Sequence, residues 1–207
     1  YEEVLIPSLN FIASSNAVIY NNSIPHYIDC DYDLGINFNK LDSYLTKITR
    51  IKNNQCFNKK TGRIIKAIIP THIFGRVSKI AKLKSICKKF KLILIEDASE
   101  AFGTFFKRRH AGTFGLCGAI SFNGNKIITT GGGGAILTNS KKIYLKINFL
   151  ASVSKKKTNH NSRYDEVGYN FKMPSINAAL GISQLKKINY ILIKKKQNYF
   201  EYKNLFK

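Results

Sequence analysis

Two ionisable side chains stand where this sequence could do chemistry. Lys126 lies between a strand-like apolar run and four consecutive glycines, residues 131–134. Asp97 follows directly after the apolar run LILIE, residues 92–96. A lysine that forms a Schiff base must lose its proton, and a semi-enclosed site favours the neutral amine. For Asp97 alone, a carboxylate that keeps a cofactor cation protonated and a carboxylate that caps a following helix are equally good interpretations.

These residue types meet the needs of pyridoxal phosphate. That cofactor uses a lysine for its aldehyde, a carboxylate for its pyridinium nitrogen and hydrogen-bond donors for its phosphate. Ser121 lies five residues before Lys126, at the end of a strand-like run, where its hydroxyl could meet a phosphate. The neighbouring glycines permit backbone conformations closed to other residues, and a plain turn is compatible with that role. Lys126, Asp97 and Ser121 are therefore candidates for one site.

The elements that would position these residues alternate along the first half of the chain. Continuous apolar runs predict strands, and apolar residues at helical spacing predict helices. The expected strands are residues 24–31, 66–75 and 92–96, and the expected helices are residues 15–20, 41–51 and 77–90. Uninterrupted apolar strands between helices are typical of a parallel sheet covered on both faces. We predict an α/β fold with three layers, α-β-α, and a mostly parallel sheet, whose carboxyl edge is where ligands bind.

The second half follows a different pattern. Short strands at 119–122 and 134–138 are expected to flank Lys126 and the glycines. A helix at 141–151, a polar loop at 152–166, a helix at 176–188 with Ser175 as its N-cap, and a Lys-rich amphipathic helix to the end are expected to follow.

The formal net charge of +22 admits a partner that is nucleic acid or an anionic membrane surface. The lysines are spread along the whole chain, and no RNA-binding motif, zinc finger or helix-turn-helix pattern accompanies them. We favour a lysine-rich composition without a specific nucleic-acid partner, in a protein that would still attract anionic substrates.

Cysteine usage and hydropathy indicate the compartment. The four cysteines lie far apart, without a CxxC pair or a histidine at metal-ligand spacing, so they are interpreted as reduced thiols of a cytoplasmic protein without a metal site. No apolar run approaches the roughly 18 residues that span a bilayer, so no membrane association is expected.

Six blocks carry a resemblance to a known family. They are PSLNFIASSNAVIY, IPHYIDCD, IIPTHIFG, IEDASEAFG, AISFNGNKIITTGGGGAILT and GYNFKMPSINAALGISQL. In order and spacing the sequence resembles the DegT-type nucleotide-sugar aminotransferases, which are fold-type I pyridoxal-phosphate enzymes. Within that family it looks most like the UDP-N-acetylbacillosamine transaminase branch, which also serves legionaminic acid synthesis.

The resemblance implies roles at the cofactor. Lys126 looks like the catalytic lysine that bonds to the cofactor and shuttles protons, and Asp97 resembles the partner of the pyridine nitrogen. Glu100 matches a position that approaches the cofactor's 3-hydroxyl. Ser121 corresponds to a phosphate ligand. Phe11 sits where the family has a stacking aromatic, although its composition alone indicates a core residue.

The resemblance implies further contacts with less specific residues. Asn170 resembles the residue that reaches the cofactor phosphate of a neighbouring subunit, which implies a homodimer with shared active sites. Lys172 falls where relatives usually carry arginine, so an anion contact stays available without bidentate geometry. Asn123 and His72 are candidate substrate contacts, and a structural role for His72 is equally good.

The activity implied is transfer of an amino group to C4 of a nucleotide-linked 4-keto-6-deoxy sugar, of the UDP-linked N-acetylhexosamine type, for surface glycan biosynthesis. Glutamate is the expected amino donor and pyridoxal 5'-phosphate the expected cofactor. Lys126 separates this activity from that of relatives with a histidine there, which perform dehydration. The alternatives are a basic nucleic-acid-binding protein and a non-catalytic truncated member of the fold.

The resemblance also implies the extent of the chain. Residues 1–190 match the central part of the large, cofactor-binding domain, and residues 191–207 match the start of a helix that leads to a C-terminal small domain. Family members have a phosphate-binding turn in a segment before Tyr1. We therefore expect little or no activity from these 207 residues alone.

Overall fold

The computed structural model describes residues 1–157 and 161–206, and the chain divides into two compact units. Unit 1 comprises residues 1–120 and 136–139, and unit 2 comprises residues 121–135 and 140–207.

Unit 1 is built on a mixed, mostly parallel sheet. The strands are β1 (Glu3–Pro7), β2 (Ile24–Ile28), β3 (Thr49–Lys52), β4 (Gln55–Asn58), β5 (Ile64–Ile68), β6 (Ile93–Asp97), β9 (Cys117–Ser121) and β10 (Gly134–Leu137). They lie in the order β10-β9-β6-β5-β1-β2, and β4 joins β5 with β3 outside it. The pairs from β2 through β1, β5 and β6 to β9 are parallel. The pairs β3 with β4 and β4 with β5 are antiparallel.

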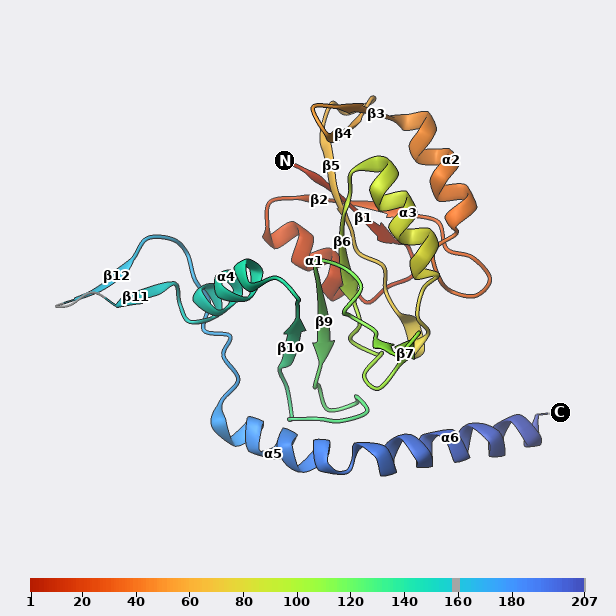
Figure 1. Cartoon of the computed structure of the whole chain (residues 1–207), viewed down its shortest axis with the longest axis vertical. Coiled ribbons are helices and arrows are strands. Elements are labelled where there is room, and N and C mark those ends of the chain that lie inside the picture. The colour runs from red at the N-terminus through yellow and green to blue at the C-terminus, as the bar shows by residue number, and fades with distance from the viewer. Residues whose placement is uncertain (158–160, 207) are drawn as a thin grey trace. The chain divides into compact units, whose positions relative to one another are not determined.

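Helices cover both faces of this sheet. Helix α1 (Ile12–Tyr20) lies on one face, and α2 (Phe38–Ile48) and α3 (Ile80–Phe90) lie together on the other (Figure 1). The apolar faces of α2 and α3 supply Leu45 and Leu83, which are fully buried against strand residues such as Ile65 and Ile68. The predicted α-β-α architecture with a mostly parallel sheet is confirmed.

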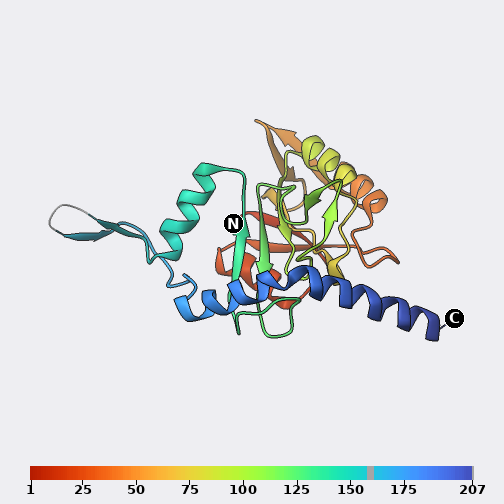
Figure 2. The same ribbon diagram turned by 60° about the horizontal axis from the view of Figure 1, so that its bottom comes forward.

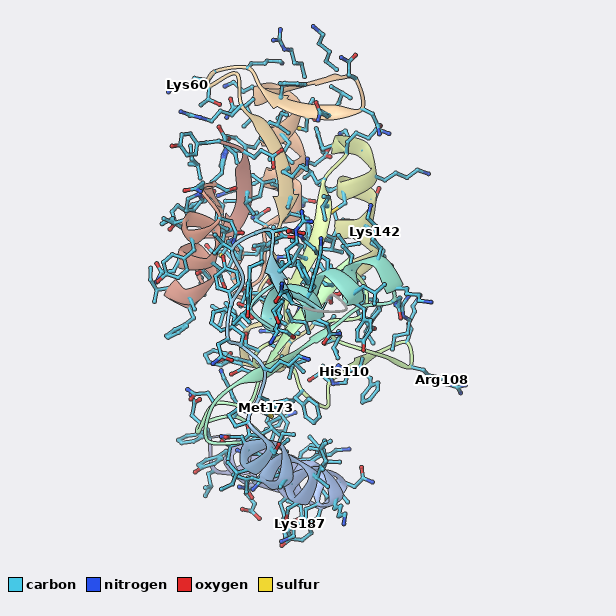
Figure 3. All side chains as sticks on the ribbon, turned by 90° about the vertical axis from the view of Figure 1, so that its left-hand side faces the viewer. Lys60, Arg108, His110, Lys142, Met173 and Lys187 are labelled. Atoms are coloured by element: carbon cyan, nitrogen blue, oxygen red, sulfur yellow. The ribbon has the colours of Figure 1, made fainter. Side chains whose placement is uncertain are left out.

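A short hairpin follows β6 in unit 1. It consists of β7 (Phe105–Phe106) and β8 (Arg109–His110), which are antiparallel. Its two connecting residues, Lys107 and Arg108, both have positive φ angles. The side chains of Lys60 and Arg108 in unit 1 extend outward (Figure 3).

Unit 2 is mainly helical. Its elements are α4 (Lys141–Ala151), the antiparallel strands β11 (Lys155–Lys157) and β12 (Ser162–Tyr164), and the helices α5 (Ser175–Lys186) and α6 (Ile188–Leu205). Figure 2 shows α5 and α6 following one another along one direction. No residue of α6 is buried. Among the helices that the structure describes, none combines the length and apolar character needed to cross a bilayer.

Several expected boundaries were wrong. The strand expected at 66–75 ends at Ile68, because Pro70 has no N–H to continue the ladder, and Ile73–Gly75 form a 3-10 turn. The loop expected at 152–166 contains β11 and β12. Ser175 is the first helical residue of α5 and makes no capping bond, because Pro174 occupies the N-cap position.

Candidate active site

Asp97 lies at the carboxyl end of β6, at the edge where parallel α/β sheets bind ligands. Its backbone is fixed from two sides. It pairs with Ala119 of β9 in parallel register, and its N–H donates to the Pro70 carbonyl at 3.0 Å. The position of the Asp97 carboxylate is therefore set by the sheet.

Two serines hold the Asp97 carboxylate. The Ser14 hydroxyl, in the first turn of α1, donates to Oδ2 at 2.7 Å. The Ser99 N–H donates to Oδ1 at 3.1 Å, and the Ser99 hydroxyl also bonds to Oδ1. Residues 98–104 are described in full and form turns without a helix, so the helix-cap interpretation of Asp97 is wrong.

Phe11 immediately precedes α1, the helix that carries Ser14. Its carbonyl accepts from the Ser14 N–H at 3.1 Å, which ties the aromatic residue to the turn that contacts Asp97. The Phe11 side chain is 75% exposed. The interpretation of Phe11 as a core residue is therefore wrong, and an uncovered aromatic ring lies one helical turn from the carboxylate contact.

Glu100 lies on the turn after Asp97. Its Oε2 accepts from the Phe74 N–H at 2.8 Å, so it is bonded to the 3-10 turn that follows β5. Gly75 has a φ of +75°, and a Cβ there would lie 3.1 Å from the Glu100 carbonyl oxygen and 3.3 Å from the Thr104 hydroxyl oxygen. The close approach of these two turns therefore requires a glycine at position 75.

His72 is fully buried and bonded at both ring nitrogens. Its Nδ1 accepts from the Ser78 N–H at 3.3 Å, so the proton is on Nε2, which donates to Glu96 Oε2 at 2.9 Å. This arrangement favours the structural interpretation of His72 over a substrate contact.

Glu96, the neighbour of Asp97, is a fully buried carboxylate. Besides His72, it accepts from the backbone N–H groups of Gly112 at 2.9 Å, Phe114 at 2.6 Å and Gly115 at 2.7 Å. Burial raises the pKa of the Glu96 carboxyl, but the bonds from His72, Gly115 and Gly112 outweigh it and lower this pKa below its ordinary value. Glu96 therefore ties β6 to the segment that leads into β9.

In unit 2, Lys126 lies on the turn between β9 and β10. Its side chain is half-buried, and its N–H donates to the Asn123 carbonyl at 3.1 Å. The Asn123 N–H in turn donates to the Ser121 hydroxyl oxygen at 3.3 Å. The loop therefore links three of the predicted site residues through one backbone–backbone bond and one bond to the Ser121 hydroxyl.

The glycine run closes this loop. Gly131 and Gly133 have φ angles of +78° and +87°, a region that favours glycine. The Gly133 carbonyl accepts from the Phe122 N–H at 2.9 Å, and the Thr130 N–H donates to the Phe122 carbonyl at 3.0 Å. Two of the four glycines are thus required by their conformation.

The block that contains Asn170 and Lys172 adjoins the same loop. Met173 follows directly, and its Cε is 3.3 Å from where a Cβ on Gly133 would lie (Met173 is labelled in Figure 3). The Asn177 side chain donates to the Thr130 carbonyl at 2.6 Å. Asn170 and Lys172 themselves are exposed.

Each unit, taken by itself, presents side chains of the kinds that pyridoxal phosphate requires. An ionised carboxylate has about four lone-pair sites, and Ser14 and Ser99 use three of those on Asp97, which leaves one on Oδ2 for a protonated ring nitrogen. In unit 1, an exposed aromatic ring lies near Asp97 on Phe11. In unit 2, Ser121 supplies a hydroxyl on the loop that carries the half-buried Lys126. Sequence reasoning missed Ser14 and Ser99, because a serine in a helix or a turn carries no pattern of its own.

Comparisons with known proteins identify the family of this chain. The family model described as the DegT/DnrJ/EryC1/StrS aminotransferase family matches residues 1–207. A GDP-perosamine synthase of Caulobacter vibrioides is 34% identical over 191 residues, which cover 91% of this chain and 46% of the relative. A UDP-4-amino-4,6-dideoxy-N-acetyl-beta-L-altrosamine transaminase of Helicobacter pylori is 27% identical over 99% of this chain and 51% of its own length.

A solved structure gives the same result. The Helicobacter pylori aminotransferase PseC, involved in the biosynthesis of pseudoaminic acid, superposes with a TM-score of 0.85 at 27% identity, over 100% of this chain and 52% of that one. The chain thus spans about half the length of the relatives it matches. Aminotransferases of this kind depend on pyridoxal phosphate. The match along the whole chain shows that this protein belongs to the DegT/DnrJ/EryC1/StrS aminotransferase family.

Proposed function

We propose that the protein transfers an amino group, from glutamate, to C4 of a nucleotide-linked 4-keto-6-deoxy sugar for surface glycan biosynthesis. The observation that carries this proposal is the setting of Asp97, a carboxylate held by two serines at the carboxyl end of β6 with one acceptor site left. Strand β9, the parallel neighbour of β6, leads at its carboxyl end into the loop that carries Lys126.

Five residues would hold pyridoxal phosphate. When bound, the cofactor supplies an electron sink that makes a proton on the substrate carbon removable. Asp97 would keep the proton on the ring nitrogen, and Phe11 would cover the ring face. Glu100 would face the 3-hydroxyl. Ser121 would donate to the phosphate, and Asn170 would do so for the site of a second subunit in a homodimer.

Lys126 would move the protons. Its Nζ, once neutral, takes a proton from the amino donor's carbon and returns one to C4 of the sugar, as general acid–base catalysis requires. Asn123 and Lys172 would contact the nucleotide sugar. Lysine keeps the charge of the arginine it replaces but gives up the planar fork, so we expect a weaker anion contact there.

The cofactor assignment can be tested on the protein as its gene encodes it. After incubation with pyridoxal phosphate, we expect a visible absorbance band, and borohydride should fix the cofactor covalently on the peptide that contains Lys126. Lys126→Ala should lose both signals, whereas Lys142→Ala, in the exposed part of α4, should keep both. A stable label on another lysine would refute the role of Lys126.

The sugar acceptor can be identified by measuring the formation of 2-oxoglutarate from glutamate in the presence of each candidate sugar. The relatives include enzymes named for GDP-linked and for UDP-linked sugars, so both classes of 4-keto-6-deoxy sugar should be compared. We expect turnover with UDP-linked N-acetylhexosamine derivatives. Turnover with the GDP-linked sugar alone would overturn the UDP assignment and leave the aminotransferase assignment intact.

A further inference from the structure

The β7–β8 hairpin of unit 1 displays an unusual combination of charge and exposed aromatic surface. Lys107, Arg108 and Arg109 are consecutive and exposed, and Phe105 beside them is 61% exposed. In Figure 3 the Arg108 side chain extends away from the ribbon, whereas His110 lies close to it.

The turn of this hairpin holds residues that its backbone does not favour. Phe106 pairs with Arg109, so Lys107 and Arg108 form a two-residue connection, and their φ angles are +47° and +62°. Such turns strongly prefer Asn-Gly, because a side chain in the left-handed region costs roughly 1–2 kcal/mol per residue. Backbone strain of this kind is concentrated at functional sites.

The hairpin is nevertheless held in place. The Phe106 and Phe114 rings are 6.2 Å apart, and the Arg109 guanidinium lies 4.9 Å over Phe114. On the other face, the His110 ring lies 5.1 Å from Phe105, and His110 Nε2 accepts from the Gly103 N–H at 2.8 Å. The hairpin therefore presents Lys107, whose Nζ lies 5.8 Å over the Phe106 ring, and Arg108 from a packed base.

The two cations at the tip differ from the minority of lysines that are paired with a carboxylate. Lys89, Lys146 and Lys156 lie against Asp42, Glu166 and Asp165. In the part of the chain that the structure describes, by contrast, no carboxylate is paired with Lys107 or Arg108. Their charge is thus available to an external anion.

We propose that this hairpin binds a nucleoside diphosphate, with the diphosphate on Lys107 and Arg108 and the base against Phe105. Guanidinium and ammonium groups bind phosphate, and an exposed ring gives a base a stacking surface. The proposal rests on the proposed function, because the ligand would be the nucleotide part of the nucleotide-sugar substrate.

The test uses UDP and GDP as probes, by calorimetry at low salt, on the protein as its gene encodes it. Lys107→Asn/Arg108→Gly gives the turn its favoured residues, so it should raise the melting temperature while it weakens UDP binding about tenfold or more. The control, Lys195→Gln/Lys196→Gln on exposed α6, removes the same charge and should leave UDP binding unchanged. Phe105→Ala should weaken binding of UDP but not of pyrophosphate.

The outcomes separate this proposal from the proposed function, because UDP binding is measured without the cofactor. If the hairpin variant and the control bind UDP with equal affinity, the hairpin proposal is wrong, even where borohydride fixes the cofactor on Lys126. A hairpin variant that loses affinity for a DNA duplex but not for UDP would also overturn it, in favour of a nucleic-acid surface. Loss of UDP affinity in the hairpin variant alone supports it, whatever the cofactor label shows.

Discussion

Glu96→Gln should destabilise unit 1 more than its small change in shape suggests. Each Glu96 oxygen accepts two hydrogen bonds, Oε1 from Phe114 and Gly115 and Oε2 from Gly112 and His72. A glutamine keeps one oxygen and turns the other acceptor into an NH₂ group that faces two N–H donors. The variant therefore loses two hydrogen bonds to a charged group, whichever way its amide is oriented.

The magnitude follows from those two bonds. Hydrogen bonds to charged groups contribute about 1.5–3 kcal/mol each, so the free energy of unfolding should fall by about 3–6 kcal/mol. That is a large part of the roughly 5–15 kcal/mol that stabilises a typical domain. Urea denaturation measures it, and Glu2→Gln is a matched control, because the Glu2–Lys66 ion pair is exposed and such pairs contribute about 1 kcal/mol or less.

The pH dependence gives a second readout with a definite sign. The Glu96 pKa is lowered in the folded state, so its contribution is complete above the ordinary value of 4.5 and is lost as the pH falls below that value. As the pH falls below about 5, where carboxylates titrate, the free energy of unfolding of the wild-type protein should decrease. The free energy of unfolding of Glu96→Gln should decrease less over the same range. A fall of less than about 1 kcal/mol at pH 7 would refute the reasoning, because it would mean that these hydrogen bonds contribute little net stability.

Two further perturbations test the packing and the cofactor site. Gly118→Ala should lower the free energy of unfolding by about 1–3 kcal/mol or more, because a Cβ at Gly118 would overlap the backbone of Gly112, and thermal unfolding measures this. Ser14→Ala removes the hydroxyl that orients Asp97, so it should weaken pyridoxal phosphate binding by about tenfold, which corresponds to one hydrogen bond to a charged group, and fluorescence titration measures this.

Matched variants control for both changes. Gly132→Ala should be tolerated, because nothing lies within 4 Å of its Cβ position. Ser43→Ala, on the exposed face of α2, removes a hydroxyl that contacts only backbone carbonyls, and should leave cofactor affinity unchanged. A loss of stability at Gly132 as large as that at Gly118, or equal cofactor affinities of the two serine variants, would contradict these expectations.

The sequence predicted β6 because its apolar run is uninterrupted, and it predicted the second half of β5, but it missed the central strand β1. The end of LILIE led directly to Asp97, and the glycine run marked the loop of Lys126. The helix expected at 41–51 ends at Ile48, so its last three residues belong to β3. Strand β4 was missed because QCFN is largely polar. Asn53 and Asn54 between these two strands have φ angles of +49° and +58°, so this asparagine pair was the available hairpin signal.

Contacts between distant segments could not be predicted from pattern. Ser14 lies 83 positions from Asp97 in the sequence, and only the packing of α1 on the sheet joins them. Phe11 was assigned to the core by its type, but it precedes α1 and stays exposed because no described element covers it. The hairpin at β11 and β12 was missed, because lysines on both faces leave no apolar alternation.

The adjacent acids Glu96 and Asp97 show how the fold fixes the register of β6. Successive side chains of a strand leave on opposite faces, so one acid reaches the Gly112–Gly115 segment while the other reaches α1. A slip of β6 by one residue would exchange them, and the shorter acid could not span the buried gap. A substitution that shifts the register of β6 should therefore lower the stability of the fold at the same time as it displaces Asp97.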